Sequence, residues 1–138
     1  MYRSLKEVTL STTPLFTTAE AKDFLKVDTT ADDTLIDNLI KAATESCQIY
    51  TNQYFLNTVV EQYSDKWSEV YTINAVHVKY TVGYGTASTD VPDGIKQAVL
   101  LTLGNWYENR QTVITGRTAT ELPLSSQYLL DQYKIQTC

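Results

Sequence analysis

The chain has little of what builds disulfide-bonded or zinc-binding proteins. Its 138 residues include two cysteines, one histidine, three prolines and five glycines. Cys47 falls on the apolar face of a predicted helix and Cys138 is the last residue, so we expect no disulfide between them. Two such thiols fit a reducing compartment. With one histidine and no Cys-x-x-Cys pair, the sequence also argues against a zinc site.

Long apolar runs and basic clusters are missing as well. Gln97, Thr102 and Gly104 interrupt the most apolar stretch before it reaches the roughly 20 residues that a membrane helix needs. The N-terminus lacks the apolar block of a signal peptide, so we expect a protein of the cytosol with no membrane partner. Eleven Lys and Arg are scattered among sixteen Asp and Glu, and the net charge is −5. Because tight non-specific binding of nucleic acid draws on clustered basic residues, the sequence argues against tight DNA binding but allows a surface that DNA slides past without sticking.

Residues 91–110, VPDGIKQAVLLTLGNWYENR, form the most informative stretch. Pro92 suits the first position of a helix, where a missing N–H costs nothing. Apolar side chains then fall on more than one side of the helix, namely Ile95, Val99, Leu100, Leu101, Leu103, Trp106 and Tyr107. A surface helix of a small monomer would keep about half of its circumference polar. The helix is therefore predicted to be central to the fold, or to face another subunit as well.

Three further helices are predicted. Thr17 and Glu20 have the spacing of a capping box, which starts a short helix over 18–26. Thr30 or Asp32 is expected to cap a long helix over 31–51. A short closing helix is expected over 126–133. The residues predicted to be mostly buried are Ile36, Leu39, Ile40, Ala43, Cys47, Ile95, Ala98, Val99 and Trp106.

The segment 55–82 changes to the alternating pattern of β-strands. A short strand at Glu7–Leu10 and another at Glu69–Ile73 are further candidates, and Gly83-Tyr84-Gly85 reads as a turn that needs positive φ. The predicted fold is mainly α (α+β): a compact helical domain with two long helices, shorter N- and C-terminal helices and a small antiparallel β-sheet. It is a single domain over 1–138, with an extended lead-in at 1–14 and a mobile loop or arm at 111–124.

No motif indicates catalysis, a metal site or a cofactor. Asp28, Asp32, Asp33 and Asp37 lack the order of a calcium loop, and carboxylates at a helix start are better explained by capping and the helix dipole. His77 is expected to be a solvent-facing strand residue, because no nucleophile motif accompanies it. No GK[ST] follows the glycine turn, which argues against a phosphate loop. We therefore expect a protein that is not an enzyme and uses no cofactor.

Tyrosine is unusually frequent, with ten in the chain. Several could be half-buried residues whose hydroxyl reaches the surface. Alternatively, they could supply contact area between subunits, where tyrosine is enriched. The sequence favours neither reading over the other.

Taken in order, several stretches resemble the head–tail connector (adaptor) proteins of long-tailed bacteriophages, a family also labelled DNA-packaging proteins. The resemblance covers about residues 15–133, although Glu61–Ile73 looks shorter and more polar than the family's usual strand region. The similar stretches are 15–22 (LFTTAEAK), 25–28 (LKVD), 32–43 (DDTLIDNLIKAA), 50–51 (YT), 78–85 (VKYTVGYG), 91–98 (VPDGIKQA), 106–110 (WYENR) and 129–133 (LLDQY).

The resemblance implies a ring, commonly of twelve copies, beneath the portal of a DNA-filled head. Such a ring extends the DNA channel, offers a platform for the next neck or tail-completion protein, and lies in the virion neck after assembly in the host cytoplasm. The isolated chain could stay monomeric until the portal templates the ring. Other readings are a different neck or tail-completion protein, or a protein-binding module of a host cell.

Two sets of contact residues are predicted on this basis. The subunit interface is expected at Leu100, Leu103, Tyr107 and Arg110, on the apolar helix. Attachment to the portal is expected in the C-terminal part, through Arg117, Tyr128, Leu129, Leu130 and Tyr133. The alternative for the last helix is that it closes its own domain, because a helix this short must dock somewhere.

Overall fold

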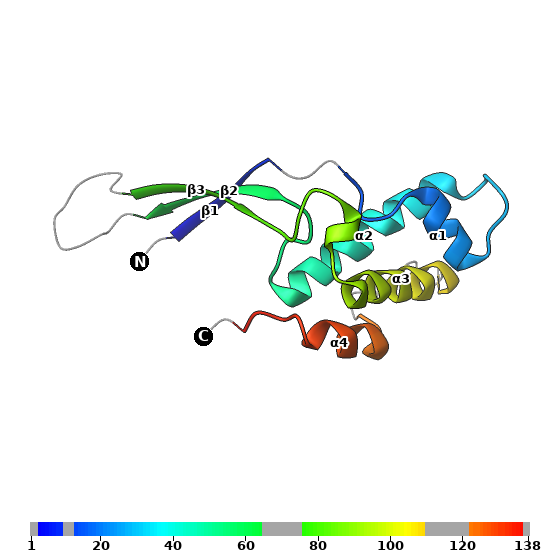
Figure 1. Cartoon of the computed structure of the whole chain (residues 1–138). Helices are drawn as coiled ribbons and strands as arrows, with labels where there is room; N and C mark the ends of the chain where they lie inside the picture. The colour runs from blue at the N-terminus through cyan, green and yellow to red at the C-terminus, as the bar shows by residue number, and fades with distance from the viewer. Residues whose placement is uncertain (1–2, 10–12, 65–75, 110–121, 137–138) are drawn as a thin grey trace.

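The computed structural model describes residues 3–9, 13–64, 76–109 and 122–136, and it confirms the predicted α+β class. In chain order the elements are β1 (Arg3–Thr9), α1 (Thr18–Leu25), α2 (Asp33–Thr51), β2 (Thr58–Ser64), β3 (Val76–Val82), the 3-10 turn η1 (Ser88–Asp90), α3 (Asp93–Glu108) and α4 (Leu124–Asp131). The helices form one body, and the sheet extends from that body as an arm (Figure 1).

Helix α3 lies in the middle of the helical body. It packs against α1 and α2 on one side and against α4 on the other (Figure 1). It begins at Asp93, one residue later than predicted, because Pro92 stands at the N-cap position and not at the first helical position. Five of its residues are buried, which are Ile95, Ala98, Val99, Thr102 and Leu103. The prediction that this helix is central to the fold is therefore confirmed, and its several apolar sides are explained by three neighbouring helices.

The predicted core is confirmed with two adjustments. Seven of the nine expected residues are buried, while Leu39 and Trp106 are partly buried and pack against the core from its margin. Other members come from outside the long helices: Leu15, Phe16, Ala21, Phe55, Leu56, Val91, Leu122 and Leu130.

A buried cluster of hydroxyl groups joins α4 to α3. Ser126 Oγ donates to the carbonyl oxygen of Ala98 at 3.1 Å, and Thr102 Oγ1 lies 3.0 Å from Ser126 Oγ. The Cys47 sulfur is 3.9 Å from Thr102 Oγ1, and burial raises the pKa of this thiol to about 11. Because each hydroxyl has a partner, the cluster can sit inside the core without an unpaired polar atom. The expectation that Cys47 is a buried helix residue is confirmed.

The start of α2 corrects the expected role of its carboxylates. Asp32 is at the N-cap position, but its side chain makes no capping bond, and it accepts instead from the Tyr107 hydroxyl of α3 at 2.8 Å. Asp33 pairs with Lys22 of α1 at 2.8 Å. Asp37 accepts a hydrogen bond from Thr18. The acidic start of α2 therefore ties three helices together, because these carboxylates bind groups of α1 and α3.

The capping box at the start of α1 is confirmed. The Thr17 side chain accepts from the backbone N–H of Glu20, and the Glu20 carboxylate accepts from the backbone N–H of Thr17 at 2.8 Å. Hydrogen bonds from Thr17 lower the pKa of Glu20, because they stabilise its charged form. The helix then ends at Leu25, and the C-cap residue Lys26 adopts a left-handed conformation with φ 57°.

The sheet has three antiparallel strands in the order β1-β2-β3. The first strand begins at Arg3, earlier than the expected Glu7–Leu10, because it pairs along the whole of β2 up to Ser64. Between β2 and β3 the register sets Tyr80 opposite Val60 and Lys79 opposite Glu61. The candidate strand at Glu69–Ile73 lies outside the described residues.

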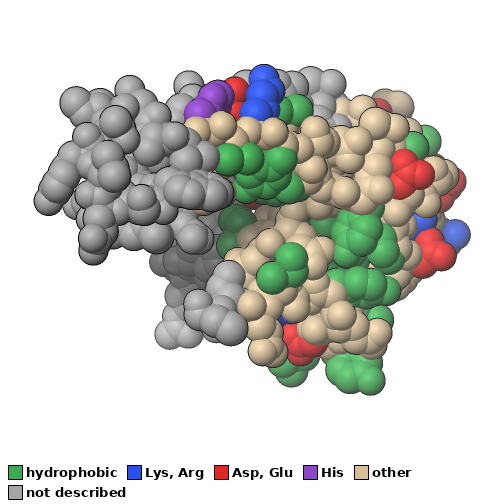
Figure 2. Space-filling view, turned by 60° about the vertical axis from the view of Figure 1, so that its left-hand side comes forward, with side chains coloured by type: hydrophobic (Ala, Val, Ile, Leu, Met, Phe, Trp, Pro, Cys, Tyr) green, Lys and Arg blue, Asp and Glu red, His purple; other side chains and the backbone are tan. Residues whose placement is uncertain are grey.

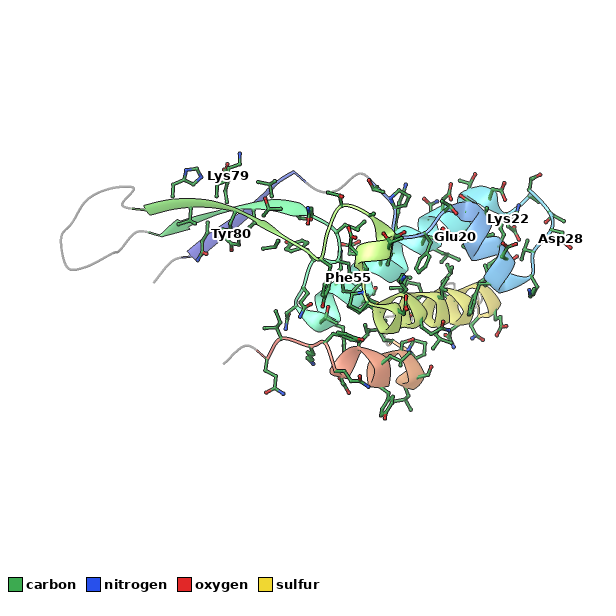
Figure 3. The ribbon with its side chains drawn as sticks, in the orientation of Figure 1. Glu20, Lys22, Asp28, Phe55, Lys79 and Tyr80 are labelled. Carbon is green, nitrogen blue, oxygen red and sulfur yellow. The ribbon has the colours of Figure 1, made fainter. Side chains whose placement is uncertain are left out.

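The turn after β3 holds the arm against the helical body. Gly83 has φ 127°, and a Cβ there would come within 2.6 Å of the Leu56 backbone, so the expected need for positive φ is confirmed at this residue. The N–H groups of Tyr84 and Asn57 donate to the carbonyl oxygens of Phe55 and Gly85, at 3.1 and 2.9 Å. The arm therefore leaves the body at a fixed junction beside buried Phe55 (Figure 3).

The bond between Tyr107 and Asp32 gives a first testable prediction. Replacing Tyr107 by Phe keeps the ring but removes a part-buried hydrogen bond to a carboxylate. We expect the free energy of unfolding to fall by about 1–2 kcal/mol. Urea denaturation followed by circular dichroism measures this change. The control is Tyr128→Phe at a side chain that is 72% exposed, where we expect a change within about 0.5 kcal/mol. Equal effects of the two changes would contradict the assigned role of the bond.

Candidate functional site

The described residues carry no arrangement typical of catalysis. Within 3–9, 13–64, 76–109 and 122–136, no group of three or more His, Cys, Asp or Glu is placed to hold a metal ion. His77 is exposed, as expected, and its Nε2 lies 3.5 Å from Glu61 Oε2. No described helix is long and apolar enough to cross a membrane.

A groove of about 490 Å³ lies where the arm meets the helical body. One face of the sheet forms one wall, and the C-terminal end of α2 and the segment after α4 form the other. Figure 2 shows a hollow between the sheet and the body, with apolar side chains next to it. The lining residues are Asn52, Gln53, Tyr54, Val60, Tyr80, Val82, Gly83, Tyr84 and Ile135.

Hydrogen bonds fix the walls of this groove. The Tyr84 hydroxyl donates to Gln53 Oε1 at 2.8 Å, and Gln53 Nε2 donates to the carbonyl oxygen of Tyr133 at 2.6 Å. The N–H of Ile135 donates to the carbonyl oxygen of Thr51 at 3.0 Å. Partial burial and then the neighbouring Tyr133 raise the pKa of Tyr84. The groove is therefore preformed, and Tyr84 stays neutral at physiological pH.

The two faces of the sheet differ in character, as the alternation in the sequence predicted. Lys79 and Tyr80 leave opposite sides of the sheet (Figure 3). On the outer face, the Lys79 ammonium and His77 both lie 3.5 Å from the Glu61 carboxylate. On the other face, Tyr80 and Val82 line the groove beside Val60. The groove therefore exposes the apolar face of the sheet.

Helix α4 has one side that is buried against the core and another that is exposed to solvent. Leu130 and Ser126 are fully buried, so the prediction that Leu130 contacts the portal is corrected: its side chain belongs to the chain's own core. Leu129 and Tyr133 are partly buried and pack against the core. On the outer side, Leu124 and Tyr128 are 82% and 72% exposed. The inner side therefore closes the chain's own domain, and the outer side leaves apolar surface exposed.

The residues expected at a subunit interface also differ in their burial. Leu103 is fully buried between the helices, so its predicted interface role is corrected to a core role. Leu100 and Tyr107 are partly buried. Arg110, together with Arg117 of the expected portal contact, lies outside the described residues. The expected mobile arm 111–124 also falls there in large part, although Leu122 is buried and Leu124 already begins α4.

The groove is the feature that reasoning from the sequence missed. The alternation of Val78, Tyr80 and Val82 did indicate an apolar face of the sheet. What no pattern in the sequence indicated is that Ile135, more than fifty residues later, would form the opposite wall. That wall depends on the backbone hydrogen bond from Ile135 to Thr51, which joins segments far apart in the chain.

Comparison with known proteins gives a family and a fold. The family model described as phage gp6-like head-tail connector protein matches residues 17–134. A chain from the neck of an empty gene transfer agent (GTA) particle, computed with C6 symmetry, is similar with a TM-score of 0.74 and 17% identity, covering 98% of this chain and 97% of that one. A chain from the virion of a native GTA particle gives a TM-score of 0.72 and 16% identity, covering 97% and 96%. No curated protein matches the sequence.

Substitutions on the two sides of α4 test whether its inner side docks on the core. Ser126→Leu places a larger side chain in the buried cluster and removes the bond to Ala98, and we expect a loss of about 1–3 kcal/mol in the free energy of unfolding. The matched change Ser125→Leu is at an exposed neighbour on the same helix and should stay within about 0.5 kcal/mol. Chemical denaturation measures both. If the two variants were equally stable, α4 would not be docked on its own domain.

Proposed function

This chain belongs to the phage gp6-like head-tail connector protein family, and from that premise we propose that it forms a ring beneath the portal of a phage or phage-like head. The chain is a structural protein of the virion neck that joins head to tail. In the proposed ring, for which the family resemblance implies twelve copies, the protein extends the DNA channel and carries the next neck or tail-completion protein.

The family match carries this proposal, because it spans 118 residues of the chain, from 17 to 134. The structure supports it with surfaces suited to protein contacts, which are the groove, the outer side of α4 and the exposed end of α3. The net charge of −5 suits a channel wall that lets DNA pass without tight binding. A purely structural role, with no enzymatic activity, is part of the proposal.

The subunit boundary is proposed near the C-terminal end of α3. Tyr107 near that end and Leu100 in the middle of the helix are partly buried, so each keeps some surface for a neighbour. Arg110 comes three positions after Tyr107 in the sequence, and we include it in the proposed boundary as a charged contact. Tyr107 already donates to Asp32 within its own chain, so a boundary here would cover a bond that also stabilises the monomer.

Attachment to the portal is proposed through the outer side of α4. Leu124 and Tyr128 lie one turn apart and are the two most exposed large apolar side chains among the described residues. Leu129 and Tyr133 would flank this contact, and Arg117, earlier in the sequence, is proposed as a charged contact. Large exposed aromatic and aliphatic side chains of this kind are typical anchors of protein interfaces.

Deleting the gene for this chain tests its proposed role in joining head to tail. Without it, we expect DNA-filled heads and separate tails in place of joined virions, because no ring would connect the portal to the tail. Electron microscopy of lysates, with the intact gene supplied in trans as the control, gives the readout. Normal numbers of joined particles in the absence of the chain would contradict the proposed function.

Portal attachment has its own test. In the folded full-length chain, we expect Tyr128→Asp to weaken binding to purified portal at least tenfold, because it places a charge in an apolar contact. The matched control is Ile49→Asp, at an α2 side chain that is 69% exposed and belongs to neither proposed surface. Binding is measured by surface plasmon resonance, and thermal denaturation checks folding. Equal portal binding by both variants would assign the attachment to another surface.

A further inference from the structure

Strand β3 stands at the edge of the sheet and also forms a wall of the groove. The strand order is β1-β2-β3, so β3 pairs with β2 on one side, and no other described strand lies along its second side. An edge strand presents a row of backbone N–H and C=O groups that no neighbouring strand satisfies. The same strand contributes Tyr80 and Val82 to the groove. An open backbone edge and an open apolar groove therefore meet at β3.

Of the two edge strands, β3 has the more regular backbone. Its residues, Val76–Val82, pair with β2 without a shift in register. The pairing of β1 with β2, in contrast, shifts between Glu7 and Thr9. A bulge of this kind bends an edge strand and disturbs the row of donors and acceptors that another strand would need, so it opposes further pairing. The edge of β1 is protected in this way, and the edge of β3 is not.

The face of β3 that meets the groove is apolar. His77 and Lys79 lie on the outer face beside Glu61. On the groove face the strand presents Val78 and Tyr80, which are 46% and 37% exposed. The described residues that line the groove include no Asp, Glu, Lys, Arg or His. Because an unpaired charge is costly to bury, a segment that covers this face needs apolar side chains there.

A second copy of β3 is a poor match for this edge. If two such strands paired antiparallel along their full length, each central residue would lie opposite itself, and the central residue is Lys79. Like charges directly opposite each other destabilise a strand pair. The pair would also be a closed two-fold dimer, which leaves no β3 edge for a third copy. These observations favour a strand from a different protein.

We propose that β3 binds an extended segment of a different neck protein, which adds a fourth strand to the three-stranded sheet and places every second side chain on the groove face. The inference rests on the proposed function, because it takes the partner from the neck. Side chains of adjacent strands alternate between the faces in step, so apolar residues at alternate positions of the segment would lie beside Val78, Tyr80 and Val82. Backbone hydrogen bonds would supply affinity, and the groove would select apolar side chains.

Two aspartate variants on opposite faces of β3 test the inference. Val78→Asp places a carboxylate against the apolar side chains of the added strand, whereas Thr81→Asp puts the same charge on the outer face of the same strand, at an exposed residue. In heads purified with their necks, we expect Val78→Asp to lower the amount of one other neck protein about tenfold or more, and Thr81→Asp to lower it less than about twofold. Quantitative mass spectrometry measures that amount per copy of this chain, and thermal denaturation of the isolated variants checks that they fold.

Electron cryomicroscopy of necks with the unaltered chain identifies the occupant. An extended main chain of a different protein, about 4.8 Å from β3, supports the inference. A bare edge, or an edge paired with residues of the same chain or of a second copy, overturns it, and so do equal losses in the two folded variants. Each of these results leaves the neck role intact, whereas necks that do not contain the chain would contradict the proposed function itself.

Discussion

Burial of α3 on several sides is the constraint on which the rest of the structure depends. This helix carries too many apolar residues for a single buried stripe, and their removal from water requires neighbours around most of its circumference. Helices α1, α2 and α4 supply those neighbours. The position of α4 follows from this requirement, since a helix of eight residues would be marginal in isolation and is stabilised here by packing Leu130 into the core.

Polar contacts then determine how the helices are aligned. The hydroxyl groups of Thr102 and Ser126 meet inside the core, so α4 fits α3 in one register. At the far end, Asp32 and Asp33 bind groups from two different helices. Hydrophobic packing is not directional, whereas these bonds require particular distances and angles. They therefore give the helices of the body one defined arrangement.

The arm follows a different principle from the body. Its strands pair chiefly with one another, and the Gly83 turn holds it against the backbone of Leu56. Because the arm extends from the body, one face of its sheet is left to form the wall of a groove. A monomer gains nothing from an open apolar face, but a subunit of an assembly can bury it against a partner. The architecture is thus consistent with a connector, whose stability and whose contacts come from different parts of the chain.

Local chemistry in the sequence determined the elements, and tertiary structure decided their partners. The capping box at Thr17, the central position of the 91–110 helix and the alternation in β3 could all be predicted, because each depends on residues a few positions apart. The pairing of β1 with β2, the Asp32–Tyr107 bond and the groove wall at Ile135 could not. Each of these joins segments more than fifty residues apart, and the spacing of residues along a chain does not specify which distant segment will meet it.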